Sequence, residues 1–65
     1  MAYQSLTFQG VTTVDQVNKI TTALMMLDGV DSAEVGRHGA EVEGRAKREA
    51  LIKAVEKLNL GIKVS

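Results

Sequence analysis

The sequence contains no cysteine and no proline, and its aromatic residues are one tyrosine and one phenylalanine. Without cysteine the chain has no disulfide, no thiolate metal cage and no nucleophilic thiol. The absence of proline, together with 25% charged residues, disfavours a linker or a disordered tail. The few aromatics exclude an RNA-recognition domain, which stacks bases on aromatic side chains of its central strands.

An excess of charge is also missing, because 8 basic and 8 acidic side chains cancel. Since general binding to nucleic acid needs a basic excess that releases counterions, we expect no nucleic-acid partner. No apolar run is long enough to span a bilayer. The first residues, MAYQSLTFQG, lack the basic start and the apolar stretch of a signal peptide. We therefore expect one small, soluble, cytoplasmic domain, residues 1–65, that does not insert into a membrane.

The first half of the chain has the periodicity of a strand followed by a helix. Residues 3–9 alternate, with Leu6 and Phe8 on one side, as in a half-buried strand. Thr13 and Gln16 have the spacing of a capping box, which opens a helix. That helix is expected to stop at Asp28-Gly29, where glycine suits the left-handed position past a helix end. Its inner stripe comprises Val17, Ile20, Leu24 and Leu27.

The second half repeats the alternation of strand and helix. Residues 32–35 and the stretch around Val42, ending at Gly44, predict a hairpin that turns at Arg37-His38-Gly39. A second helix is expected over residues 47–58, with Leu51, Val55 and Leu58 on its inner line, and a last strand over residues 62–64. The element order predicts an α+β, ferredoxin-like βαββαβ sandwich, with two helices on one face of a four-stranded antiparallel sheet. Glu34, Glu41 and Glu43 are then expected on the open face of that sheet.

Several segments together resemble the heavy-metal-associated domains of copper chaperones and metal-pumping ATPases. Residues 23–30, ALMMLDGV, look like the family's helix end, and the strand-to-loop stretch Leu6-x-Phe8-x-Gly10 is similar to the one that leads into its metal loop. Residues 42–44, VEG, followed by 49–55, EALIKAV, look like its third strand and second helix. The resemblance covers nearly the whole chain and implies the same ferredoxin-like fold.

The metal loop is where the chain departs from that family. The family's loop reads G-M-x-C-x-x-C, whereas residues 10–16 read GVTTVDQ, so that Thr13 and Gln16 stand at the two cysteine positions. Soft thiolates select Cu(I) or Zn(II), and a hydroxyl and an amide are weak, neutral, hard donors. We therefore expect no metal and no other cofactor at Thr13 and Gln16.

The remaining soft or titratable donors form no evident ligand set. Met25 and Met26 diverge by about 100° on a helix, so their sulfurs do not readily share one ion, and packing on the flank of the helix or a neutral docking patch is the simpler interpretation. His38 stands alone at a predicted turn beside Arg37, which favours an exposed turn residue over a ligand.

Basic side chains gather on the second predicted helix. Its start carries positive charge that opposes the helix dipole, and no Ser, Thr, Asp or Asn caps it. We call the whole set the basic face: Arg45, Lys47, Arg48, Lys53 and Lys57. Because the basic start of the helix breaks a local rule without visible compensation, we hypothesise that the face docks an acidic partner surface. The alternative is a solubilising face, softened by a Glu49–Lys53 pair.

Two functional hypotheses follow, and neither is an enzyme. No paired acid and base suggests a catalytic cleft, and residues 10–16 lack the arginine of an acylphosphatase-like phosphate loop. The first hypothesis is a metal-independent module that binds a protein of unknown identity. Its candidate surface is Thr12, Thr13, Gln16, Met25 and Met26, with the basic face as the other option. The alternative is a residual copper or zinc carrier that uses methionine, histidine, carboxylates or thiolates supplied by a partner. Either edge strand is also free to pair with a second copy, giving a homo-oligomer.

Overall fold

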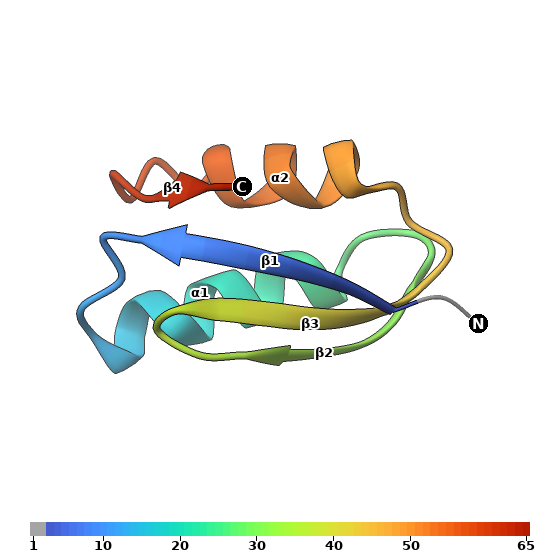
Figure 1. The fold of residues 1–65 in the computed structure, drawn as a ribbon, viewed down its shortest axis with the longest axis horizontal. Coiled ribbons are helices and arrows are strands. Elements are labelled where there is room, and N and C mark those ends of the chain that lie inside the picture. The colour runs from blue at the N-terminus through green and yellow to red at the C-terminus, as the bar shows by residue number, and fades with distance from the viewer. Residues whose placement is uncertain (1–2) are drawn as a thin grey trace.

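The structure is a computed structural model that describes residues 3–65. The predicted domain's first two residues lie outside this range. In chain order the elements are β1 (Tyr3–Gln9), α1 (Val14–Met25), β2 (Val30–Val35), β3 (Gly39–Gly44), α2 (Arg48–Glu56) and β4 (Lys63–Val64) (Figure 1). Among residues 3–65, no helix is long and apolar enough to cross a membrane.

The strands form one antiparallel sheet of 4 strands in the order β2-β3-β1-β4. Both helices pack on the same face of this sheet, with α1 behind the strands in Figure 1 and α2 along the β4 side. The predicted ferredoxin-like α+β architecture is therefore confirmed. The long β1–β3 pairing, from Tyr3 opposite Glu43 to Thr7 opposite Gly39, forms the centre of the sheet.

The core lies between the helices and the inner face of the sheet. Its strand residues alternate along each strand, and its helix residues recur at three- and four-residue spacing, so each element contributes one apolar face. The buried hydrophobic residues are Leu6, Phe8, Val11, Ile20, Leu24, Ala40, Val42, Leu51 and Val55. Val17 and Leu27, predicted for the same stripe of α1, are only partly buried against this cluster.

Some element boundaries differ from the prediction. Helix α1 ends at Met25 with Met26 as its C-cap, so the Asp28-Gly29 pair lies in the turn that follows. Gly29 has φ of +90°, and its carbonyl accepts hydrogen bonds from the N–H groups of Arg45 (2.6 Å) and Ala46 (3.0 Å). Through these two hydrogen bonds, Gly29 holds the turn after α1 against the segment that leads into α2. Helix α2 is shorter than the predicted 47–58, and β4 is shorter than the predicted 62–64.

The elongated molecule has two distinct ends. At the one we call the loop end, the 10–13 loop lies beside the β2–β3 hairpin, since the Phe8 N–H donates to the His38 carbonyl over 2.9 Å. At the one we call the junction end, the turn after α1 meets the start of α2, and the Gln4 side-chain amide donates to the Ala46 carbonyl. Because α1 begins at the loop end and finishes at the junction end, residues near its two termini are held apart.

Candidate functional site

The loop at the family's metal position is closed by hydrogen bonds between its own residues. Gln16 Oε1 accepts from the Thr12 N–H at 2.7 Å and from the Thr13 N–H at 3.1 Å. In return, Thr13 Oγ1 accepts from the Gln16 N–H at 3.2 Å. The capping box predicted from the sequence is therefore confirmed, with Thr13 as the N-cap of α1.

These hydrogen bonds engage both side chains that replace the family's cysteines. The Thr12 hydroxyl also reaches Gln16 Oε1, at 3.3 Å, so three donors converge on one amide oxygen. The position of the family's methionine is held by Val11, which is 8% exposed and belongs to the hydrophobic core. A metal ion bound here would have to break the helix cap to reach oxygen donors that are neither soft nor charged.

The other soft or basic donors are far from this loop or from one another. Met25 and Met26 lie at the junction end, 46% and 79% exposed, as predicted for residues off the inner stripe of α1. His38 lies at the loop end, on the hairpin. Within residues 3–65, no group of three or more His, Asp or Glu side chains is placed to hold a metal ion. The candidate surface of the loop and the two methionines is thus divided between opposite ends of the molecule.

The residues of the basic face are all exposed and are distributed along α2 from one end to the other. Lys47 is the N-cap of α2 and makes no side-chain capping bond, which confirms that this helix start is uncapped. Arg48 donates from Nη1 to the Ser5 carbonyl, at 2.7 Å, on the part of the β1 edge that β4 does not cover. Lys53 and Lys57 continue the face toward the C-terminal end of α2 and are exposed. Arg45 precedes the helix at the junction end and is likewise exposed.

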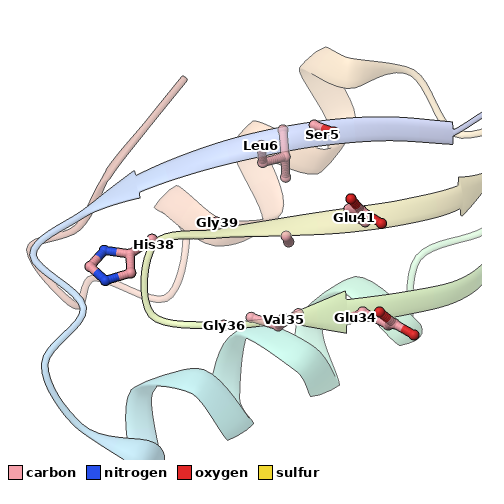
Figure 2. Close-up of a pocket in the computed structure, with 9 residues that line it drawn as sticks. Ser5, Leu6, Glu34, Val35, Gly36, His38, Gly39 and Glu41 are labelled. Atoms are coloured by element: carbon pink, nitrogen blue, oxygen red, sulfur yellow. The ribbon is translucent and has the colours of Figure 1, made fainter.

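The open face of the sheet carries the opposite charge. Glu34 and Glu41 lie directly across from each other on β2 and β3, while Glu43 accepts a hydrogen bond from the Ser32 hydroxyl at 3.3 Å. Glu34 and Glu41 border a shallow, open hollow of about 500 Å³ that also adjoins His38 (Figure 2). We call these three carboxylates the glutamate face.

A groove along the outside of α1 was not predicted from the sequence. Its volume is about 450 Å³, and α1 supplies nearly all of its lining. The lining residues are Asp15, Asn18, Lys19, Thr22, Ala23, Met26 and Leu58. Leu58, assigned to the inner line of α2, follows the end of that helix; it is partly buried against the core and also borders the groove. The sequence signal for this groove was the small Ala23, which follows Thr22 and stands one helical turn after Lys19.

Comparison with solved structures finds this fold in copper-binding domains and metallochaperones. A copper-binding domain from HMA7, a P-type ATPase, superposes with a TM-score of 0.88 at 24% identity, over 100% of this chain and 92% of that one. The CopZ metallochaperone also gives a TM-score of 0.88, at 22% identity, over 98% of this chain and 100% of that one. The N-terminal domain of a potential copper-translocating P-type ATPase from Bacillus subtilis, solved in its Cu(I)-loaded state, gives 0.85 at 28% identity, over 97% and 82%.

No protein-family model matches the sequence, and no curated protein matches it. The likeness is therefore one of structure, and it extends over essentially the whole chain. The protein has the heavy-metal-associated, copper-chaperone-like fold, without cysteine at the positions where that family binds metal.

Proposed function

We propose that this chain is a non-enzymatic protein-interaction module that uses the copper-chaperone-like fold without carrying metal. The observation that supports this most directly is the reciprocal hydrogen bonding of Thr13 and Gln16. These residues occupy the metal positions and form a helix cap there. The loop thus has a structural role that is independent of any ion.

The basic face is the proposed docking surface, and an acidic protein surface is the proposed partner. The set has five cations, against Glu49 and Glu56 on the same helix. Within residues 3–65, Arg48 is the one member of the set whose side chain has a hydrogen bond, to the Ser5 carbonyl. Lys47 occupies an N-cap that Asp or Ser would fill better, since a cation opposes the helix dipole there. A sequence that keeps a lysine at this cost is consistent with selection for binding.

A titration with Cu(I) under anaerobic conditions, against a competing chelator and with Zn(II) in parallel, tests the metal-independent part of the proposal. We expect the native protein to remove no Cu(I) from the chelator. Stoichiometric uptake by the native chain would overturn the proposal in favour of the residual carrier.

The positive control is the double variant Thr13→Cys with Gln16→Cys. It places two thiolates at the N-cap and N3 positions, where the capping box already brings each side chain to the backbone N–H of the other residue. We expect this variant to remove Cu(I) from the chelator. If the variant folds but takes up no copper, the assignment of residues 10–16 to the family's metal loop is wrong.

The docking surface is tested by reversing charge on α2. The variant Lys53→Glu with Lys57→Glu is compared with Arg37→Glu with Lys63→Glu, which changes the net charge by the same amount at exposed positions outside helix α2 and outside the basic face. We expect an affinity matrix made with native protein, and one made with the control variant, to retain the same acidic partner. The α2 variant should lose it. Equal retention by all three matrices would exclude the basic face.

A further inference from the structure

Helix α1 presents an uncharged ridge to solvent. Residues four apart lie one above the other on a helix, so Val14, Asn18, Thr22 and Met26 form a continuous row. Both ends of the row are apolar and highly exposed, with Val14 at 72% and Met26 at 79%. We call this row the α1 ridge. Val14 and Met26 are about 18 Å apart along the helix, with Asn18 and Thr22 between them, so the row offers an apolar contact at each end and polar contacts at its centre.

The groove beside the α1 ridge has a form that a ridge can fill. It runs between the α1 ridge and a second row, Asp15, Lys19 and Ala23, and the small side chain of Ala23 deepens it. Leu58 closes its α2 side with an apolar wall. Packing the ridge of one helix into the groove of another is the general way in which helices associate. One face of α1 therefore holds both halves of such a contact.

We propose that a second copy of this chain fills the groove, with the two α1 helices antiparallel about a twofold axis. The centre of the row lies between Asn18 and Thr22. Antiparallel pairing therefore places Val14 over the partner's Met26 at one end of the contact. At the other end it places Met26 over the partner's Val14. The amide of Asn18 then faces the partner's Thr22 hydroxyl near the axis. Such an isologous contact uses one self-complementary patch and closes as a dimer.

The distribution of charge favours α1 over the other faces for self-association. Two glutamate faces would repel each other, because each carries three carboxylates. Two basic faces would repel for the same reason, with the opposite sign. The α1 ridge carries no charge, and the groove has one acidic and one basic residue, Asp15 and Lys19. Of these three faces, the one on α1 offers a second copy a neutral, partly apolar surface.

The sheet edges are poorly suited to the strand pairing considered from the sequence. A register shift between Val30 and Ser32 makes the pairing of β2 with β3 irregular, and an irregular edge strand pairs less readily with another chain. On β1, the Arg48 side chain already occupies the Ser5 carbonyl. Helix α1 has no such protection.

Sedimentation velocity over about 0.02–1 mM protein tests the proposal. A patch of this size gives a weak dimer, with a Kd of about 0.1–1 mM. We expect Met26→Glu to weaken dimerisation at least about tenfold, since it puts a carboxylate into the groove. The matched control is Met25→Glu, which carries the same change about 100° around the helix and should leave the dimer intact.

A second variant keeps the test independent of any folding defect in the first. Val14→Glu places an acidic residue in the first turn of α1, where the helix dipole favours it, and should also abolish the dimer. Circular dichroism establishes that each variant is folded. A native protein that is monomeric at the highest concentration would overturn the proposal, and so would a dimer that both variants leave unchanged.

Salt separates this dimer from the other mode of self-association that the charges permit. Docking of the basic face on the glutamate face of a second copy is heterologous, so it would not stop at a dimer. It would also disappear at about 0.5 M salt, where exposed charges are screened. We expect a dimer that persists at that salt concentration. Open-ended, salt-sensitive association would overturn the α1 dimer.

Discussion

Among single residues, Thr13 and Gln16 show how a binding loop can be converted into a structural one. An N-cap needs a side-chain oxygen that accepts from the N3 amide, and a capping box adds an N3 side chain that reaches back. Thr13 and Gln16 provide both, at 3.2 and 3.1 Å. The same two positions hold the thiolates in the family that this chain resembles. Because both functions need side chains at the start of α1, one set of residues replaces the other without a change of fold.

The first prediction is that Thr13→Ala lowers the free energy of unfolding by about 1 kcal/mol, because the Gln16 N–H loses its acceptor. Thr12→Ala is the matched control: its hydroxyl makes a long, exposed contact with Gln16 Oε1, so the change should be close to zero. Urea denaturation followed by circular dichroism measures both. Equal losses would mean that the cap adds nothing specific to the stability of α1.

The second prediction concerns Gly44, which lies against the Gly29 carbonyl that links the turn after α1 to the start of α2. Its φ is +145°, and a Cβ added there would collide with the Gly29 carbonyl oxygen. That oxygen also accepts from Arg45 and Ala46, so it has little freedom to move. Gly44→Ala should cost more than about 1 kcal/mol.

Gly36→Ala is the control for Gly44→Ala. The nearest atom to its added Cβ, the Gly39 carbonyl oxygen, is at 3.8 Å, an ordinary contact, and no positive φ is required there. It should leave the urea midpoint nearly unchanged or raise it. If both alanine variants were equally stable, the close approach of Gly44 to Gly29 would not be a constraint in solution.

Among whole elements, strand and helix periodicity predicted the order of the elements and the inner side of both helices and of the first three strands, but not every boundary. The ends of α1 illustrate the difference. Its start was predictable because Thr13 and Gln16 carry a specific capping chemistry. Its end was placed too late, because Gly29 was interpreted as a helix terminator when its carbonyl serves the start of α2. Contacts between segments distant in sequence decide such positions, and a local pattern does not contain them.

The same limit applies to the candidate surface. The sequence identified which residues are exposed, including Met25, Met26 and the basic face. The candidate surface nevertheless combined the methionines with the loop, although the predicted helix was already long enough to place them at its two ends, as the 12-residue α1 does. The sequence did not reveal the groove, which needs Leu58 from beyond α2 beside Ala23 of α1.

Helix α2 yields a prediction that links stability to the proposed docking. Lys47→Asp should raise the free energy of unfolding by about 1 kcal/mol, because Asp caps the free N–H groups and its charge suits the helix dipole. Lys57→Asp, at the opposite terminus, should lower it by a few tenths of a kcal/mol, because a negative charge opposes the dipole at that end. Thermal unfolding at low salt measures both.

If the basic face binds an acidic partner, Lys47→Asp should weaken that binding while it stabilises the protein. A stabilised variant that binds as well as the native chain would show that Lys47 is outside the docking surface. A variant that is not stabilised would show that α2 does not begin at this residue.

Over the whole molecule, the net charge is zero, but the acidic and the basic side chains lie on different faces. The sheet presents the glutamate face, α2 presents the basic face, and α1 lies beside α2 on the helical side with its uncharged ridge. A neutral chain of this kind can offer an acidic partner one surface and a second copy another. The two proposed contacts are on different helices, so charge reversal on α2 and Met26→Glu on α1 should act independently.

The fold itself depends on one small core, and adjacent residues of α1 allow this to be tested. Leu24 is 0% exposed and packs within the shared cluster, whereas Met25 is 46% exposed. Leu24→Ala should cost about 2–5 kcal/mol through lost burial and a residual cavity. A domain of this length has a free energy of unfolding of only about 3–10 kcal/mol, so that variant should be largely unfolded at modest urea concentrations.

The control is Met25→Ala, which changes a neighbouring residue to the same good helix former and should cost less than about 1 kcal/mol. Because helix propensity is nearly equal in the two variants, a difference in their urea midpoints reports burial alone. Equal midpoints would mean that α1 does not present its Leu24 side to the sheet, and the positions of the groove and the α1 ridge would then be wrong as well.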